Sequence, residues 1–345
     1  MVVINGKFFS QKVTGVQRYA REILKELDKL LTPDSDYVVL VDKYAVDIPA
    51  YRNIKVKQSG HFSGNVWEQL SLPLYVLKHG AVCVNLCNMA PILTPHVVVI
   101  HDVSYKVNKQ FFSKKFTAWY NFVFSLIIRR ITQIITVSQF SRDEICRAYR
   151  HDFENITVTY NGWQHFSDIP YDKNALGKYG LDKKGFYFAM SSMAPNKNFK
   201  WIAENAVLNP ETVYAVSGSV NKKVFGDGLD FEVPSNLKFL GYISDSEART
   251  LMEECRAFIF PTFYEGFGIP PLEALSAGAK AVVSDSSCMR EIFGDHVYYI
   301  DPYNAHIDLG ALISGSVRQP SELLEKYSWK DSAERLLQAI NMIKN

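Results

Sequence analysis

Short apolar runs alternate with amphipathic helical segments along the chain, and this alternation restricts the possible folds more than any other feature. Some of the runs, such as Val97–Ile100 and Ala257–Phe260, carry no polar residue at all. Such runs are typical of strands buried on both faces, as in a parallel sheet with helices on each side. The alternation starts again near Phe186, so we predict an α/β chain built from two doubly wound halves.

The length of 345 residues also suits two domains of ordinary size. Residues 163–184 are rich in Asp, Lys, Gly and Pro and show no clear periodicity, which is typical of a connecting segment. We therefore predict an N-terminal domain over residues 1–165, a linker over 166–185 and a C-terminal domain over 186–325. The remaining residues, 326–345, are expected to form a helix that packs back on the N-terminal domain.

The connection after the strand Ala257–Phe260 combines glycines with acidic residues. Glu265 precedes a Gly-Phe-Gly segment, and a helix opens at Pro270 with Glu273 in its first turn. Glycines let backbone N–H groups approach a ligand, and the N–H groups of a helix start bind anions, most often phosphate. The alternative is that Glu273 only complements the helix dipole and that the glycines form a tight turn, because a lone Gly-x-Gly is a weak signal.

Further polar residues lie where parallel α/β sheets usually bind ligands, at the carboxyl ends of strands. His101 and Asp102 follow the apolar run Val97–Ile100, and Lys197 lies in the loop after a strand at residues 186–190. Gly15 precedes a helix at residues 17–31, where backbone amides can approach a phosphate. For His101 the alternative is a histidine held by a local aspartate, and for Gly15 it is an ordinary turn glycine.

The residues able to hold a metal ion are weakly grouped. Asp34 and Asp36 form an Asp-x-Asp pair of a kind that can hold a divalent metal against a diphosphate, but a solvated loop explains them more simply. The five cysteines have no ligand spacing and are expected to be reduced thiols. No apolar segment has the length of a signal-peptide core or of a membrane span, so we expect a cytoplasmic protein.

Charge is unevenly distributed along the chain. The net charge is only +2, but residues 1–166 carry +7 and residues 167–345 carry −5. We expect the basic half to contact an anionic surface or ligand. The helix expected over residues 113–130 places Trp119, Phe122 and Leu126 among several lysines and arginines. Either it is a core helix with solvated lysines, which is the commoner case, or it docks on a membrane surface.

These motifs together resemble those of the retaining glycosyltransferases of family 4, also called group 1, which have the GT-B fold. The segment Glu265-Gly-Phe-Gly-Ile-Pro-Pro-Leu-Glu273 is the most specific of them, and the similarity extends over nearly the whole chain. The style of the motifs is similar to that of bacterial enzymes that assemble O-antigen, capsule or exopolysaccharide on a lipid carrier. Further segments lie in the family's order: Thr14–Tyr19, Trp67-Glu68-Gln69, Ile100-His101-Asp102, Thr136–Ser141, Pro195–Asn198 and Gly241–Asp245.

The resemblance implies two Rossmann-like domains with the site in the cleft between them. Glu265 would contact the sugar ring of the donor, Glu273 the ribose hydroxyls and Lys197 the diphosphate. His101 would lie near the reacting sugar, with Asp102 beside it on the acceptor side. The implied catalytic residues are Glu265, His101 and Lys197, and the other donor-binding residues are Gly15, Ser192, Tyr242, Gly266, Phe267, Gly268, Ile269 and Glu273.

One position departs from the family's pattern. Many members have an Arg about five residues before the lysine, as a second clamp on the diphosphate, and this chain has Ser192 there. Asn196 also replaces a frequent Arg. Lys197 is then expected to carry more of the leaving-group charge, unless Arg290 or another cation compensates.

The implied function is transfer of a hexose, with mannose from GDP-mannose favoured, to a lipid-linked saccharide. Configuration would be retained, and neither a metal nor a cofactor would be needed. We expect contact with anionic lipid on the cytoplasmic face of the inner membrane, and no nucleic-acid partner. The alternatives are a sugar-nucleotide epimerase with the same fold and a non-catalytic partner of a membrane-bound polysaccharide assembly. A nicotinamide-dependent dehydrogenase is disfavoured, since no Gly-x-Gly-x-x-Gly follows the first strand of either half.

Overall fold

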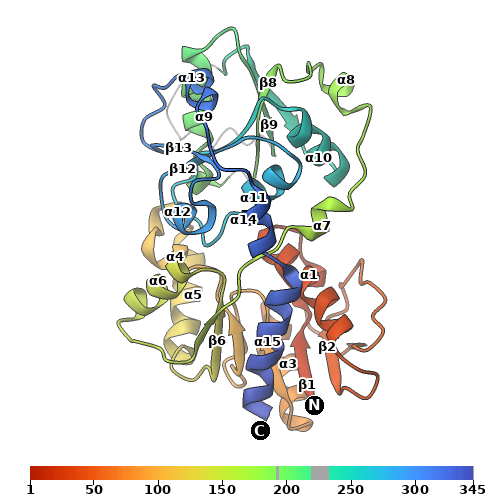
Figure 1. Ribbon diagram of the computed structural model, residues 1–345. Coiled ribbons are helices and arrows are strands. Elements are labelled where there is room, and N and C mark those ends of the chain that lie inside the picture. The colour runs from red at the N-terminus through yellow and green to blue at the C-terminus, as the bar shows by residue number, and fades with distance from the viewer. Residues whose placement is uncertain (192–193, 219–232, 345) are drawn as a thin grey trace. The chain divides into compact units, whose positions relative to one another are not determined.

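The computed structural model describes residues 1–191, 194–218 and 233–344. The chain divides into two compact units (Figure 1). Unit 1 comprises Met1–Gly162 together with Ser328–Asn345, and unit 2 comprises Trp163–Tyr327. Each unit is a parallel β-sheet flanked by helices, which confirms the predicted α/β class with two Rossmann-like domains.

Unit 1 is built on a seven-stranded sheet in the order β3-β2-β1-β4-β5-β6-β7, with all neighbouring strands parallel. Its strands are β1 (Val2–Asn5), β2 (Tyr37–Val41), β3 (Lys55–Gln58), β4 (Val82–Asn85), β5 (Val97–Val99), β6 (Gln133–Thr136) and β7 (Ile156–Val158). Every residue of β1 and β2 is buried, in agreement with their mainly apolar sequences, whereas the lysine-bearing edge strand β3 is exposed. Exposed lysines on an edge strand also oppose pairing with another sheet.

The helices of unit 1 are α1 (Gly15–Leu30), α2 (Gly64–Val66), α3 (Leu72–Lys78), α4 (Ser104–Val107), α5 (Lys114–Ile127), α6 (Gln139–Tyr149) and α15 (Trp329–Lys344), with short turns η1 (Lys7–Ser10) and η3 (Lys109–Phe111). Thr14 and Gln17 form a capping box at the start of α1. The last helix, α15, runs along α1 (Figure 1), and the Trp329 ring meets the buried Tyr19 ring edge-on at 5.9 Å. The final helix therefore completes unit 1, although unit 2 precedes it in the chain.

Helices α3 and α5 cover the same face of the unit 1 sheet. Residues paired across a parallel ladder point to the same side, and so do residues two apart on one strand. Cys83 and Asn85 share a face on β4, and Asn85 is paired with Val98 of β5. Cys83 packs in the cluster under α3, and Val98 packs in the cluster under α5. The outer surfaces of both helices thus belong to one side of unit 1.

The segment between α2 and α3 departs from regular α-helical geometry. Trp67–Ser71 form a π-helix, η2, which joins α2 to α3. The wider turn places Trp67 and Glu68 inside the protein, with neither more than 1% exposed. The Trp67 indole N–H donates to the Ser59 carbonyl oxygen at 2.7 Å, so the apolar ring and its polar atom are both accommodated.

Unit 2 has a six-stranded parallel sheet in the order β10-β9-β8-β11-β12-β13. Its strands are β8 (Phe186–Met190), β9 (Val213–Ser217), β10 (Leu237–Gly241), β11 (Ala257–Phe260), β12 (Ala281–Ser284) and β13 (Tyr298–Ile300). Its helices are α7 (Gln164–Ser167), α8 (Ala175–Tyr179), α9 (Phe199–Leu208), α10 (Asp245–Glu254), α11 (Ile269–Ser276), α12 (Met289–Phe293), α13 (Leu309–Ser314) and α14 (Ser321–Lys326), with the turn η4 (Pro195–Lys197).

The predicted linker is ordered in the structure and belongs to unit 2. It contains the second half of α7 and all of α8, which at four and five residues are too short to show a helical period in the sequence. Its backbone is tied to α10, because the Asp172 amide donates to Thr250 Oγ1 at 2.8 Å and the Tyr171 hydroxyl donates to Glu254 at 3.1 Å. The chain leaves unit 1 at Gly162, a few residues before the predicted boundary.

In both sheets the order of the strands reverses direction once. Unit 1 runs from β1 to β3 on one side and from β4 to β7 on the other, so its reversal lies between β1 and β4. In unit 2 the reversal lies between β8 and β11. Open α/β sheets bind ligands outside the carboxyl ends of their strands at such a switch point. The two reversals therefore indicate where each unit is expected to hold a ligand.

Candidate functional site

Lys197 and Glu265 meet at the switch point of unit 2. Lys197 follows β8 and Glu265 follows β11, so the two residues come from the strands on either side of the reversal. The Lys197 Nζ atom lies 2.5 Å from Glu265 Oε1, and the side chains are 18% and 14% exposed. The structure thus places a cation and a carboxylate together, with both side chains mostly buried but in contact with solvent, where a ligand is expected.

Backbone contacts hold the loops that carry this pair. Asn198 adopts a left-handed conformation with φ of 56°, which asparagine tolerates better than most residues. Its side-chain amide donates to the carbonyl oxygens of Pro261 at 2.9 Å and Pro302 at 2.8 Å. The Phe263 amide donates to the Asn196 carbonyl oxygen at 2.9 Å. The residues next to Lys197 therefore bind its loop to the connection after β11.

The turn before α11 is packed closely against α12. Gly268 has φ of 95°, and a Cβ atom there would lie only 3.0 Å from Met289 Cε. Both facts require glycine at this position. The Glu265 amide donates to Ser287 Oγ at 3.1 Å, which fixes the other end of the turn. The Gly-Phe-Gly segment is thus held in one shape between two anchored ends.

The start of α11 differs from the prediction in two respects. Ile269 is its first residue, and Pro270 and Pro271 occupy the next two positions. Because proline has no N–H group, two of the amides that a helix start can offer to an anion are missing. Among the first four residues of α11, only Ile269 and Leu272 retain an N–H group. Glu273 is the fifth residue of α11, so its predicted place in the first turn is wrong.

Glu273 is paired with a histidine that sequence reasoning missed. His165 Nε2 lies 2.8 Å from Glu273 Oε1, and the side chains are 3% and 9% exposed. His165 comes from α7, 108 residues away in the chain, and was predicted to be the last residue of the N-terminal domain, whereas the structure places it in unit 2. No local pattern links two residues at that distance, so only the fold of unit 2 brings them together. The contact orients the carboxylate that was assigned to the ribose.

Ser192, Tyr242 and Arg290 were also predicted to bind or clamp the donor in unit 2. Ser192 falls outside the described residues, and Tyr242 is 81% exposed. Arg290, named as a substitute clamp, binds Asp285 through two contacts, Nε to Oδ1 at 2.7 Å and Nη2 to Oδ2 at 2.6 Å. This guanidinium lowers the pKa of the Asp285 carboxyl. In the described structure, Lys197 is the residue at the switch point that was predicted to bind the diphosphate.

His101 lies buried at the carboxyl end of β5 in unit 1. Its Nε2 atom lies 3.0 Å from the Leu86 carbonyl oxygen, and its ring meets Tyr19 edge-on at 4.7 Å. Burial lowers the pKa of His101 from 6.5 to about 4, so the imidazole is neutral at pH 7. With Nε2–H donating to Leu86, Nδ1 is left as a hydrogen-bond acceptor. A neutral acceptor of this kind suits a sugar hydroxyl better than a phosphate.

Asp102 lies beside His101 in the connection from β5 to α4, and Gly15 follows the connection from β1 to α1, at the same edge of unit 1. Asp102 Oδ1 accepts a hydrogen bond from the Ser104 amide at 2.8 Å, at the start of α4. Gly15 is the first residue of α1 and is exposed. No group of three or more His, Cys, Asp or Glu side chains is gathered to hold a metal ion in the described ranges. Asp34 and Asp36 lie in an exposed loop, where Asp36 pairs with the N-terminal amine at 3.5 Å.

Models of known protein families match both units. Residues 13–164 match glycosyltransferase family 4, and residues 173–341 match the glycosyl transferases of group 1. The O-antigen chain mannosyltransferase RfbU of Salmonella typhimurium is 25% identical over 87% of this chain and 87% of its own length. The O-antigen chain mannosyltransferase B of Escherichia coli is 28% identical over 61% of this chain and 60% of its own length.

Solved structures with the same fold cover the whole chain. The sucrose-phosphate synthase of Thermosynechococcus elongatus aligns with a TM-score of 0.69 at 12% identity, over 100% of this chain and 94% of that one. WaaG, a glycosyltransferase involved in lipopolysaccharide biosynthesis, aligns with a TM-score of 0.67 at 16% identity, over 98% and 95%. The chain as a whole has the GT-B type of fold, with two Rossmann-like units, and the two family models together span nearly all of the sequence. The chain belongs to the group 1 glycosyltransferases of family 4.

Proposed function

We propose that the chain transfers a hexose, with mannose from GDP-mannose favoured, to a lipid-linked saccharide with retention of configuration. The observation that carries this proposal is the Lys197–Glu265 pair at the switch point of unit 2, where an open sheet binds its ligand. The preference for mannose rests on the relatives, several of which are named as mannosyltransferases.

Each residue has a role that follows from its chemistry. The Lys197 ammonium stabilises the negative charge that develops on the departing diphosphate, which is the main task in such a transfer. The Glu265 carboxylate accepts hydrogen bonds from hydroxyls of the donor sugar. Glu273, oriented by His165, does the same for the ribose, and neutral His101 accepts from the reacting sugar. The chemistry supplied by these groups requires neither a metal nor a cofactor.

The identity of the donor is tested by measuring the melting temperature of the protein with each member of a panel of nucleotide sugars and free nucleotides. A ligand at 100 times its Kd adds about 2.7 kcal/mol to the free energy of unfolding. We expect GDP-mannose and GDP to raise the melting temperature more than the uridine nucleotides. If no donor and no nucleotide changes the melting temperature, the proposal fails.

Assays of the product and of membrane binding distinguish the proposed transferase from two alternatives, an epimerase and a non-catalytic partner. A GT-B epimerase converts the nucleotide sugar in the absence of an acceptor, whereas a transferase leaves it intact. A non-catalytic partner binds a membrane but no donor. For a transferase, the anomeric proton of the product in the NMR spectrum distinguishes retention from inversion, and activity unchanged by EDTA supports the absence of a metal requirement.

We further propose that unit 1 docks on anionic lipid at the cytoplasmic face of the inner membrane. On α5, Phe122 and Leu126 are 55% and 41% exposed, whereas Val123 and Ile127, one residue further along the helix in each case, are buried. The exposed Lys115 and Arg129 lie at the two ends of this apolar surface. An apolar helix face with flanking cations suits an anionic membrane.

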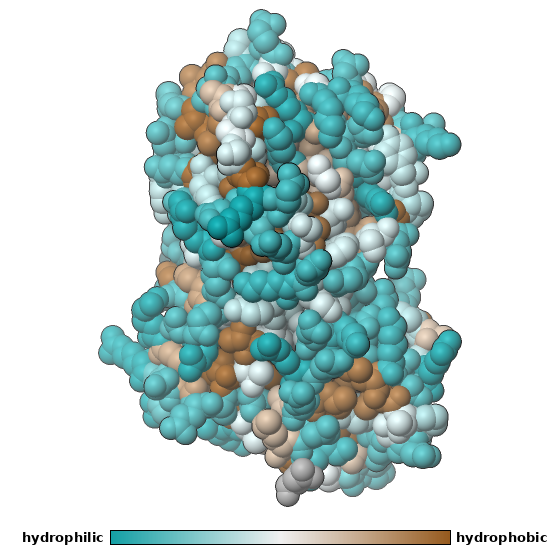
Figure 2. Space-filling view, viewed as in Figure 1, coloured by the Kyte–Doolittle hydropathy of each residue, from teal (hydrophilic) through white to brown (hydrophobic). Residues whose placement is uncertain are grey.

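The helical segment from α2 to α3, whose last part covers the same face of the sheet as α5, carries a second apolar stripe. Val66, Leu70, Leu74 and Leu77 follow one another at helical spacing along α2, η2 and α3, and each is between 47% and 65% exposed. The front face drawn in Figure 2 is mainly hydrophilic, with separate hydrophobic patches. Among the described residues, no helix is both long and apolar enough to cross a bilayer.

Vesicle sedimentation tests this docking. Phosphatidylglycerol vesicles should retain the wild-type protein, and phosphatidylcholine vesicles should retain less. The double variant Phe122→Glu/Leu126→Glu should bind about tenfold more weakly, because it removes apolar contact and adds negative charge. Val207→Glu, at a 56% exposed position of α9 in unit 2, is the matched control and should bind normally. Equal binding of all three proteins would contradict the proposal.

A further inference from the structure

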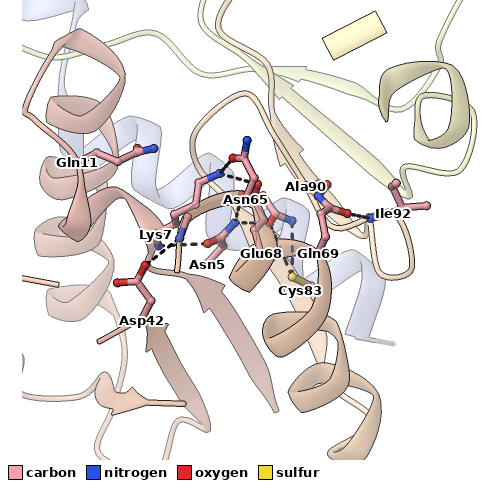
Figure 3. Close-up of polar contacts among 12 residues, drawn as sticks. Asn5, Lys7, Gln11, Asp42, Asn65, Glu68, Gln69, Cys83, Ala90 and Ile92 are labelled. Carbon is pink, nitrogen blue, oxygen red and sulfur yellow. Dashed lines mark hydrogen bonds and ion pairs between the residues drawn. The ribbon is translucent and has the colours of Figure 1, made fainter. Parts of the chain in front are cut away.

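A second lysine–glutamate pair lies at the switch point of unit 1. Lys7 follows β1 directly, and Glu68 lies in the π-helix η2. The Lys7 Nζ atom lies 2.5 Å from Glu68 Oε2, and the side chains are 10% and 1% exposed. Figure 3 shows this pair at the centre of a polar network that also contains Asn5 and Asn65.

The network spans the reversal of the strand order. Asn5, the last residue of β1, donates from Nδ2 to Glu68 Oε1 at 2.8 Å and to Asn85 Oδ1 at 3.0 Å. Asn85 is the last residue of β4, on the other side of the reversal, and donates in turn to the Val97 carbonyl oxygen at 3.2 Å. Polar side chains from both strands and from η2 therefore converge where an open sheet binds its ligand.

Stability alone is a poor explanation for this arrangement. A buried ion pair is often no more stable than apolar residues of the same volume, because both charges lose their hydration. A π-helical turn is also less common than an α-helical one and frequently occurs at functional sites. Glu68 is buried because of that turn, so the helix irregularity and the ion pair serve the same arrangement.

The network retains hydrogen-bond donors at its outer edge. The Lys7 ammonium has three N–H groups, and in the described structure it has two acceptors, Glu68 and Asn65 Oδ1, the latter at 3.2 Å. Asn65 is exposed, and its Nδ2 group has no partner among the described residues. The edge can thus donate to a ligand from both Lys7 and Asn65 while Glu68 holds the ammonium from behind.

We propose that this edge of unit 1 binds hydroxyl groups of the acceptor saccharide, through Lys7 and Asn65, with Glu68 as the positioning residue. Because Glu68 neutralises the ammonium, the site carries no net charge and favours a polyhydroxyl ligand over a phosphate or diphosphate. The proposal rests on the proposed function, since it names the part of unit 1 that takes the second substrate.

The test uses saturation-transfer NMR on the full chain with methyl glycosides of common hexoses and their disaccharides at roughly 10 mM, a concentration suited to millimolar binding. A saturating nucleotide, chosen from the thermal panel, fills unit 2 first. We expect at least one glycoside to give a signal that falls fivefold or more in Asn65→Ala. Asn341→Ala, at an exposed position of α15 in unit 1, is the matched control and should leave the signal unchanged.

Variants that change the charge of the Lys7–Glu68 pair distinguish a role in ligand binding from a merely structural role. In Glu68→Gln the amide can still face Asn5, but the Lys7 charge loses its neutralising partner. Inorganic pyrophosphate, which should not compete with the glycoside in the wild type, should then begin to compete. The double variant Lys7→Met/Glu68→Gln removes both charges, so it should lose the glycoside signal and gain no binding of pyrophosphate. Circular dichroism confirms that each variant is folded.

Three results would overturn the proposal: no glycoside signal in the wild type, an unchanged signal in Asn65→Ala, or competition by pyrophosphate in the wild type. The thermal shift with nucleotide separates this outcome from failure of the proposed function. A nucleotide shift that persists while the glycoside test fails refutes only the site in unit 1. Loss of every nucleotide shift in the wild type refutes the transferase itself.

Discussion

Each unit carries a lysine–glutamate pair with the same separation at its own switch point, but the two pairs differ in their surroundings. Lys7 and Glu68 are 10% and 1% exposed, and asparagine side chains bind both of them. Lys197 and Glu265 are 18% and 14% exposed. Lys197 stands in a loop before α9, whereas Lys7 belongs to a turn pressed against the sheet.

The difference suggests a division of labour. A pair that is locked by further hydrogen bonds keeps its geometry and its neutrality, which suits recognition of a neutral ligand. A pair in partial contact with solvent can separate, so that its cation meets a departing phosphate and its carboxylate meets a sugar. The predictions below test this contrast, beginning with the largest expected effect.

We call Lys197–Glu265 the open pair, because both of its side chains are in partial contact with solvent. Its carboxylate should be essential for transfer and of little importance for nucleotide binding. We expect Glu265→Ala to lower the transfer rate at least about 100-fold, as for the loss of one group that stabilises a transition state. The Kd for the nucleotide, measured by calorimetry, should stay within about threefold, because Lys197 remains. Glu322→Ala, on the exposed side of α14, is the control. An active Glu265→Ala enzyme would refute the role assigned to this carboxylate.

Acid should destabilise unit 1 through His101. Burial lowers the pKa of His101 to about 4 from 6.5, so the unfolded chain takes up a proton on this ring at a higher pH than the folded protein does. The free energy of unfolding keeps its full value above pH 6.5, where the ring is neutral in both states. It falls by about 2–3 kcal/mol as the pH falls towards 4.

Hydrogen exchange followed by mass spectrometry checks this prediction. Between pH 7 and pH 4, after correction for the intrinsic rates, peptides of β5 should lose more protection than peptides of β11. His101→Gln, which cannot titrate, should show a smaller loss. Equal losses in both proteins would mean that the ring does not titrate as its burial implies.

The turn that carries Glu265 should be destabilised by a Cβ atom at Gly268. Alanine there adopts an unfavourable φ of 95° and meets Met289, so we expect Gly268→Ala to cost about 2 kcal/mol. Gly278→Ala is the matched control, because its φ is 80° but no atom lies within 4 Å of the added Cβ. It should cost about 1 kcal/mol in urea unfolding. If both variants cost the same, packing against α12 contributes nothing.

The smallest effect is expected for Arg290. Its pair with Asp285 is 61% and 45% exposed, and exposed pairs contribute about 0–1 kcal/mol. Arg290→Met should therefore change stability little and alter nucleotide affinity less than about threefold. A tenfold loss of affinity in calorimetry would identify Arg290 as the cation that replaces the missing clamp, and would place a second cation beside the open pair.

The fold was largely predictable because its strands are buried runs with clear apolar sequences. Ala257–Phe260 and Tyr37–Val41 were found with their observed bounds, since burial on both faces removes polar residues from the sequence. The short helices α7 and α8 were missed because four or five residues show no period. The π-helix was missed because its apolar spacing is close to that of an α-helix.

The candidate site was predictable only where its residues follow strands in sequence. Lys197 and Glu265 were both expected at the site, because loops after strands of a parallel sheet gather at one edge. Their direct pairing was not foreseen, and neither was the contact between His165 and Glu273, because both depend on how distant loops pack. The absence of N–H groups at Pro270 and Pro271 was visible in the sequence, but its meaning required the helix start to be located.

The return of α15 to unit 1 bears on the order in which the protein folds during synthesis. Unit 1 supplies the first 162 residues, but its final helix is made after all of unit 2. Until then the apolar side of α1 that receives Trp329 and the rest of α15 stays uncovered, with Tyr19 lacking one of its ring contacts. A growing chain that still lacks α15 therefore exposes this apolar surface of unit 1, and exposed apolar surface of this kind makes an incomplete chain prone to aggregate.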